Sequence, residues 1–162
     1  FTVPNFPMKN EIKDIKAPEN HPNFSSVYAG VAPYIGYQTP IKNIDGFISI
    51  FEKHDVGTLN ILGWNSNYSK NVTYHGFLDR KAMISEMLNN SIGLIPFKKH
   101  PFHYYISPNK AYEYAHSVLL VLSTNTLKPV FDELKDHVCV FEYYDEMINQ
   151  LKYFKTTPEA EF

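Results

Sequence analysis

The sequence predicts an α/β domain built on a doubly wound parallel sheet. Short apolar runs of strand length alternate along the chain with segments whose apolar residues recur at helical spacing. This alternation is typical of βαβ units, whose crossovers are right-handed and whose helices cover both faces of the sheet. With 162 residues, of which 44% are hydrophobic, the chain can bury one full core.

The strands are expected where apolar runs end at glycine or at a polar loop. In order, the predicted strands are residues 25–30, 58–63, 72–78, 91–97, 118–123 and 138–141. Residues 1–23 hold several prolines and little periodicity, and they are predicted to form an interdomain lead-in or linker. The domain itself is expected over residues 24–155, followed by a frayed tail at residues 156–162.

The helices are expected between these strands, and each has its own start or stop signal. The first runs from Ile41 through Phe51 and ends before Gly57. The second is capped by Asp79, has Ala82, Met83, Met87 and Leu88 on one face, and ends at Asn89 and Asn90. The remaining helices are predicted at residues 108–117, 127–134 and 144–154.

Charge and composition limit the class of partner. A net charge of −2 offers no basic surface to nucleic acid, so we expect no nucleic acid partner. The one cysteine, Cys139, lies in an apolar run and is predicted to pack as a small hydrophobic residue. The sequence contains no apolar run long enough to span a membrane, and we expect a cytoplasmic location, with peripheral membrane association open for a longer protein. The chain opens with Phe1, which suggests a fragment of a longer protein.

The most informative stretch is residues 107–115, Ser-Pro-Asn-Lys-Ala-Tyr-Glu-Tyr-Ala. Ser107 is predicted to be the N-cap of a helix whose first helical residue is Pro108. The free amides at such a start, around Asn109 and Lys110, favour an anion. Glu113 follows on the same face, where its carboxylate can accept from a ligand hydroxyl. An ordinary capped helix with a solvated lysine and glutamate is the alternative interpretation.

The position of this helix favours a binding site. It follows a predicted strand and a loop of about ten residues, a length typical of functional loops. In open α/β sheets, ligands bind in the crevice at the carboxyl ends of the strands. In that loop, Lys98, Lys99, His100 and His103 could meet phosphates or could simply be solvated, and no metal site is expected there. The nearby tyrosines 104, 105, 112 and 114, like Trp64, are expected to pack in the core or an interface more often than to stack on a ligand.

Seven segments in this order resemble the C-terminal, donor-binding domain of a GT-B glycosyltransferase of the retaining family-four group. The matching segments are residues 3–5 (Val-Pro-Asn), 28–30 (Tyr-Ala-Gly), 42–45 (Lys-Asn-Ile-Asp), 59–63 (Leu-Asn-Ile-Leu-Gly), 72–77 (Val-Thr-Tyr-His-Gly-Phe), 92–96 (Ile-Gly-Leu-Ile-Pro) and 107–115. The resemblance implies a Rossmann-like domain that binds a nucleotide sugar as donor substrate. It implies neither a metal nor another cofactor. The partner would be an N-terminal, acceptor-binding domain of the same protein.

The resemblance also implies roles for individual residues. Glu113 would hydrogen-bond the donor ribose, the helix start at residues 107–110 would face the diphosphate and sugar, and Lys42 would pair with the diphosphate. The backbone from His75 through Gly76 and Phe77 to Leu78 would receive the base. Transfer would retain the anomeric configuration, with the charge on the departing diphosphate stabilised electrostatically.

The chain departs from the family pattern at several positions near this site. Tyr37 lies near the usual arginine position, and Tyr105 replaces the family's first glutamate. Val118, Leu120 and the segment 124–126 replace the glycines and proline that usually follow the helix. These departures leave open an alternative function, a catalytically degenerate Rossmann-like binding or interaction module.

Overall fold

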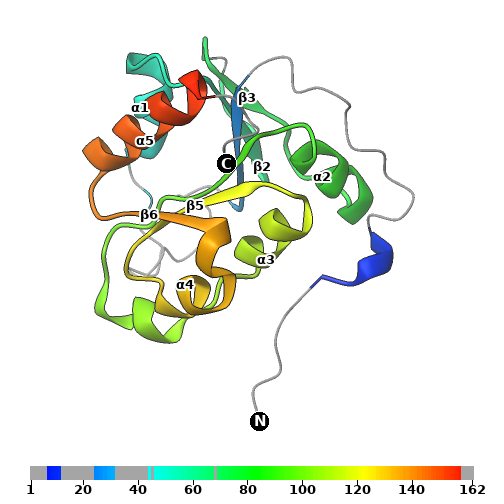
Figure 1. Ribbon diagram of the computed structural model, residues 1–162. Coiled ribbons are helices and arrows are strands. Elements are labelled where there is room, and N and C mark those ends of the chain that lie inside the picture. Colours follow the sequence, from blue (N-terminus) through cyan, green and yellow to red (C-terminus); the bar gives the residue numbers. More distant parts are fainter. Residues whose placement is uncertain (1–6, 12–23, 32–43, 45, 68, 158–162) are drawn as a thin grey trace.

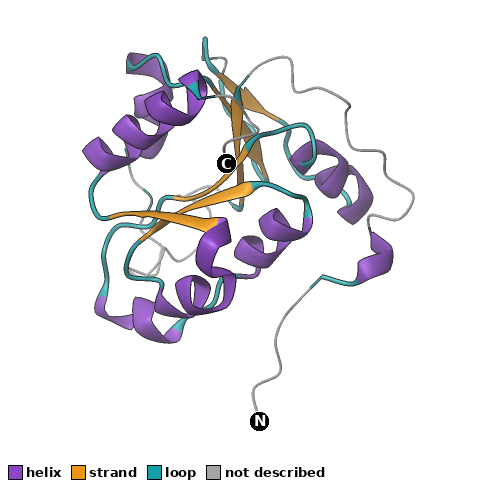
Figure 2. Cartoon of the chain, viewed as in Figure 1, coloured by secondary structure: helices purple, strands orange, loops and turns teal. Residues whose placement is uncertain are grey.

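A computed structural model describes residues 7–11, 24–31, 44, 46–67 and 69–157 of the chain. In this part of the chain, six strands form one sheet in the order β3-β2-β1-β4-β5-β6, and every neighbouring pair is parallel (Figures 1 and 2). The strands are β1 (Ser25–Ala29), β2 (Thr58–Leu62), β3 (Val72–Tyr74), β4 (Ile92–Ile95), β5 (Leu120–Thr124) and β6 (Val138–Phe141). This is a doubly wound, Rossmann-like α/β sheet, which confirms the predicted fold class.

Helices cover both faces of the sheet. The α-helices are α1 (Phe47–Lys53), α2 (Arg80–Met87), α3 (Asn109–His116), α4 (Lys128–Leu134) and α5 (Tyr144–Thr156). Short 3-10 turns add η1 (Lys9–Glu11), η3 (Pro101–Tyr105) and η4 (Lys135–His137). In Figure 1, α1 and α5 lie together on one face of the sheet, and α2, α3 and α4 lie on the other. Every residue of the central strands β1 and β4 is buried, as expected for strands covered from both sides.

The key helix starts one residue later than predicted. Pro108, expected as the first helical residue, has an extended conformation (φ −66°, ψ 128°) and is itself the N-cap of α3, so the prediction that Ser107 caps the helix is wrong. The hydroxyl of Ser107 instead hydrogen-bonds the Tyr112 hydroxyl. A proline ring fixes φ but leaves ψ open, and here ψ delays the helix.

Three other boundaries of strands and helices differ from those predicted. The expected strand at residues 72–78 ends at Tyr74, because Gly76 has a φ of +67°, which a strand cannot continue through. Val118, expected to begin a strand, has a φ of +60° and is 83% exposed, and β5 begins at Leu120. The first helix begins at Phe47 after Gly46, with Ile44 outside it, while Ile41 lies outside the described residues.

The start of α2 was predicted correctly, but its buried face was predicted only in part. The Asp79 side chain accepts a hydrogen bond from the backbone N–H of Ala82, as an N-cap should. Ala82 is exposed, and Ile84 lies in the core beside Met87 and Leu88. The apolar pattern of this helix is weak, so the sequence did not determine which face packs on the sheet. The tertiary contact with the sheet determined which residues are buried.

Candidate functional site

A cleft of about 800 Å³ opens at the carboxyl ends of β1, β2 and β4. The chain leaves β1 toward β2 and re-enters the sheet at β4, so the cleft lies at the topological switch point of the sheet. Its lining residues come from strand ends, from α2 and the loop before it, from the end of η3 and from α3 and the residues just before it: Ala29, Gly30, Val31, Leu62, Gly63, Phe77, Leu78, Met83, Phe97, Tyr105, Ile106, Ser107, Pro108, Asn109, Lys110 and Glu113. The segment selected from the sequence, residues 107–115, therefore supplies one wall of the cleft.

Tyr114 anchors this wall to the sheet. The β1–β4 ladder pairs Val27 with Gly93, and beyond that pair the Tyr114 hydroxyl lies between the strands. It accepts from the backbone N–H of Ala29 at 2.8 Å and donates to the carbonyl of Leu94 at 3.3 Å. The Tyr114 ring packs against Gly93, where a β-carbon would overlap it. These contacts fix the position of α3 relative to β1 and β4, and so the positions of the side chains next to Tyr114 on that helix.

A lysine amine lies on the floor of the cleft. The Lys110 Nζ is 3.9 Å from the centre of the Tyr28 ring and 5.4 Å from the centre of the Phe97 ring, a cation–π arrangement. Burial raises the pKa of the Tyr28 hydroxyl, so it stays neutral beside the amine. A β-carbon on Gly30 would lie 3.0 Å from the Lys110 Nζ, so the absence of a side chain at Gly30 leaves space for the amine.

Two glycine backbones meet next to this amine. Gly63 has a φ of +119°, and a β-carbon there would overlap the Gly30 carbonyl oxygen. The N–H of Gly30 donates to the Leu62 carbonyl, and that of Gly63 to the Gly76 carbonyl, each at 2.8 Å. The ends of β1 and β2 therefore present backbone rather than side chains to the cleft, which lets a ligand approach closely.

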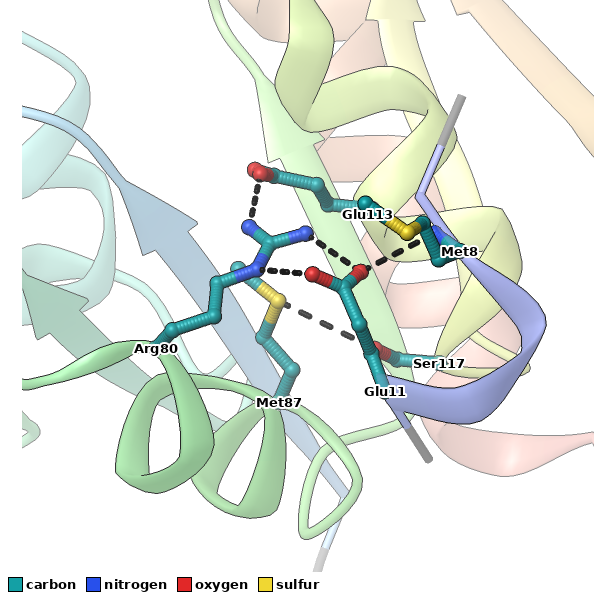
Figure 3. Close-up of polar contacts among 6 residues, drawn as sticks. All are labelled: Met8, Glu11, Arg80, Met87, Glu113 and Ser117. Atoms are coloured by element: carbon teal, nitrogen blue, oxygen red, sulfur yellow. Dashed lines mark hydrogen bonds and ion pairs between the residues drawn. The ribbon is translucent and has the colours of Figure 1, made fainter. Parts of the chain in front are cut away.

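Glu113 lines the same cleft and is bound by an arginine that the sequence did not single out. Nη1 of Arg80, the first residue of α2, donates to Oε1 of Glu113 (Figure 3). The Arg80 Nε and Nη2 donate to the two carboxylate oxygens of Glu11 at 3.1 and 2.9 Å. These hydrogen bonds raise the pKa of Arg80 and lower that of Glu11. Glu11, Arg80 and Glu113 are far apart in the sequence, and nothing in their local patterns indicated that they would meet.

The other predicted site residues are divided between the cleft and its surroundings. Tyr105 and Phe77 line the cleft with side chains that are 82% and 75% exposed. His75 lies outside the lining, with its Nε2 3.0 Å from the Asn60 Oδ1 and 3.6 Å from a Glu86 carboxylate oxygen. Gly76 also lies outside the lining, and its carbonyl accepts from the N–H of the lining residue Gly63. Lys42 and Tyr37 lie outside the described residues.

Several remaining aromatic and basic residues are structural. Trp64 is buried against the rings of Tyr28 and Tyr74, as predicted. Tyr112 and Tyr114 are buried, whereas Tyr104 and Tyr105 are exposed. His103 is buried and hydrogen-bonds Thr126, Lys99 pairs with Glu142 at 2.8 Å, and burial raises the pKa of the half-buried Cys139 thiol.

Within the described ranges, no group of three or more His, Cys, Asp or Glu side chains is arranged to hold a metal ion. No helix in this part of the chain is both long and apolar enough to cross a membrane. Comparison of the sequence with models of protein families and with curated proteins returns no match.

Proposed function

We propose that this chain is the donor-binding domain of a retaining glycosyltransferase, which holds a nucleotide sugar for transfer of a hexose to a glycan or lipid-linked acceptor. One observation carries the proposal: Lys110 and Glu113, on the same helix wall, line a cleft at the switch point of a doubly wound sheet. An ammonium group suits a diphosphate, and a carboxylate suits the vicinal hydroxyls of a ribose.

The proposed ligand lies along α3. Its diphosphate meets the Lys110 amine and the backbone at the start of α3, where the peptide dipoles favour negative charge. Its ribose hydroxyls donate to Glu113, and its base reaches the apolar side of the cleft formed by Phe77, Leu78 and Met83. In the transfer step an acceptor hydroxyl oxygen bonds to the sugar carbon as the bond from that carbon to the diphosphate breaks, and the hydroxyl proton passes to the departing diphosphate. The Lys110 amine and the start of α3 stabilise the charge left on the diphosphate. The acceptor and the remaining catalytic groups belong to a partner domain.

The cleft size and its exposed backbone support this orientation. About 800 Å³ is within the range of small-molecule and cofactor sites. Where Gly30 and Gly63 approach one another, neither residue adds a side chain, so a bulky, charged group can lie against their backbone beside the Lys110 amine.

A binding module that has lost transfer chemistry is the second candidate. The residues after α3 favour it. The glycosyltransferase family that the sequence resembles carries paired glycines in this segment, whereas this chain has the buried residues Thr124 and Thr126 there. Such a module would keep the cleft and bind a nucleotide without activating its sugar.

Calorimetric titration with the nucleoside diphosphates of the common bases, and with their sugars, tests the proposal. We expect saturable binding by the chain, and a loss of about tenfold or more in affinity for the Glu113→Gln variant, because a charge-assisted hydrogen bond contributes about 1.5–3 kcal/mol. Glu133→Gln, at an exposed position on α4, is the matched control and should bind like the unmodified chain. Absence of binding to every nucleotide would overturn the proposal. Binding without transfer by the complete protein would favour the second candidate.

A further inference from the structure

The Arg80 guanidinium divides its donors between two segments on either side of it. Its Nε and Nη2 hold the two oxygens of Glu11 in a fork-to-fork pair, and its Nη1 reaches the cleft carboxylate of Glu113 (Figure 3). A guanidinium is planar and rigid, so fixing two of its nitrogens also fixes the direction of the third. The grip of Glu11 therefore determines where Nη1 points.

The Arg80 backbone and the Glu11 carboxylate are each held by a further local contact. Arg80 is the first residue of α2, directly after the Asp79 cap, so its backbone is held by the helix start. Glu11 ends the 3-10 turn η1, and its Oε2 also accepts from the backbone N–H of Met8 at 3.2 Å. The turn lies beside α2 (Figure 1), and the Arg80 side chain lies between Glu11 and Glu113 (Figure 3). The three charged groups thus form one connected network across η1, α2 and α3.

An isolated exposed ion pair contributes little, but a bidentate pair within a network can hold a side chain in one orientation. The side chains of Glu113, Glu11 and Arg80 are 18%, 25% and 40% exposed, so the network is partly shielded from water. Arg80 donates to Oε1 of Glu113, and within the described part of the chain no hydrogen bond occupies Oε2, which can accept from a ligand hydroxyl. A glutamate held in this way does not have to be ordered when the ligand binds, which lowers the entropy cost of binding.

We propose that Arg80 is a positioning residue that presents the Glu113 carboxylate to the ribose hydroxyls of the nucleotide, and that Glu11 acts through Arg80, so that η1 takes part in the site. This inference rests on the proposed function. It assigns a role to η1 and to the start of α2, neither of which lines the cleft with these side chains. Affinity is then coupled to the position of η1.

The test compares ribonucleoside diphosphates with their 2′-deoxy and 3′-deoxy counterparts, using the base that binds tightest. A variant that merely loosens the fold lowers affinity for both kinds of ligand equally, whereas loss of positioning lowers the preference for the ribonucleotide. We expect Arg80→Gln to reduce this preference about tenfold and Glu11→Gln to reduce it about threefold, since a charged hydrogen bond is involved. Arg80→Lys keeps the charge but cannot form the fork, and should give an intermediate value.

Two controls separate positioning from charge and from folding. Lys81→Gln removes the same charge from the neighbouring exposed position of α2 and should leave the preference unchanged. In a Glu113→Gln background, Arg80→Gln should have no further effect on the preference, because the two residues act through one carboxylate. Thermal melting of each variant, followed by circular dichroism, confirms that the compared proteins are folded.

The outcomes are distinguishable. If the unmodified chain binds no nucleotide, the proposed function falls and the inference falls with it. If the chain binds ribonucleotides preferentially and Arg80→Gln lowers affinity for the ribo and deoxy ligands by the same factor, or leaves both unchanged, the inference alone is overturned. If Arg80→Gln lowers the preference but Glu11→Gln does not, the role of η1 is overturned.

Discussion

The Tyr114 hydroxyl accepts a hydrogen bond from the backbone N–H of Ala29 at 2.8 Å, at a position where β1 and β4 would otherwise pair. This side chain ends the β1–β4 ladder and joins α3 to the two central strands. The cleft begins where the strands part, so the hydrogen bond both opens the site and fixes the helix that lines it. Because Glu113 is the residue next to Tyr114, this hydrogen bond also fixes where Glu113 lies in the cleft.

Tyr114→Phe should therefore destabilise the domain. The N–H of Ala29 would lose its acceptor in a buried position, which costs about 1–3 kcal/mol of unfolding free energy. Urea denaturation followed by tryptophan fluorescence, using Trp64, measures the change. Tyr153→Phe removes a hydroxyl from an exposed tyrosine on α5 and should shift the midpoint little. Equal stability of the two variants would show that the buried hydrogen bonds contribute nothing.

Gly93→Ala should be more damaging than its single added methyl group suggests. A β-carbon at this position overlaps the Tyr114 ring, which is fully buried and cannot move aside. Overpacking of a dense core costs about 1–3 kcal/mol and would displace α3 from the sheet. Thermal unfolding is the measurement, and an unchanged melting temperature would contradict the prediction.

Gly30→Ala is the informative contrast, because its added methyl group meets the ends of side chains rather than a buried ring. The new β-carbon would lie 2.9 Å from the Tyr28 hydroxyl and 3.0 Å from the Lys110 Nζ. The lysine end can shift, so we expect a smaller loss of stability than at Gly93 together with a clear loss of nucleotide affinity. Calorimetry beside thermal unfolding separates the two effects. A Gly30→Ala variant that binds normally would argue against a ligand lying next to this amine.

Asn90 is predicted to be a structural link between α2 and the sheet. Its side chain donates to the Glu86 carbonyl at 2.7 Å and accepts from the Asn60 side chain at 2.8 Å, and it is almost fully buried. Asn90→Ala should cost about 1–3 kcal/mol, because it removes the acceptor of the Asn60 side-chain amide and one of the donors to the Glu86 carbonyl. The exposed neighbour Asn89 offers the matched control, since Asn89→Ala removes a similar side chain without these bonds. Similar denaturation midpoints for both variants would refute this role.

Stability should fall on acidification. Hydrogen bonds from Arg80, Lys155 and Lys99 lower the pKa values of Glu11, Asp55 and Glu142 respectively. A carboxyl group whose pKa is lower in the folded state stabilises the protein fully when the pH is above its ordinary pKa, about 4.5 for glutamate and 3.8 for aspartate. This contribution is lost as the pH falls through the pKa of the folded state.

Urea midpoints measured between pH 6 and pH 3 should therefore decrease, and the decrease should be shallower for Glu142→Gln, which removes one of the three titrating groups. High salt should weaken the effect, because all three carboxylates are near the surface. A midpoint that stays constant over this pH range, or a slope unchanged in Glu142→Gln, would contradict the assignment.

The sequence predicted the architecture well because the signals for it are local and repeated. The order of strands and helices follows from apolar runs and helical periodicity, and Asp79 was identified as a cap from its position alone. The boundaries were less certain where one backbone angle decides them. Ser107 and Pro108 have the sequence of a helix start, yet the ψ of Pro108 placed the cap one residue later.

For the site, the local sequence determined which stretch lines the cleft, because a strand, a loop and a helix start in this order bring residues 107–115 to the carboxyl edge of a parallel sheet. Only the tertiary structure decided what Glu113 contacts. Arg80, 33 residues away in the sequence, donates to it, and Glu11, 102 residues away, holds Arg80; no periodicity or spacing encodes such a meeting. Their arrangement depends on how α2 packs beside α3 and on where η1 lies, and these are consequences of burying one shared core.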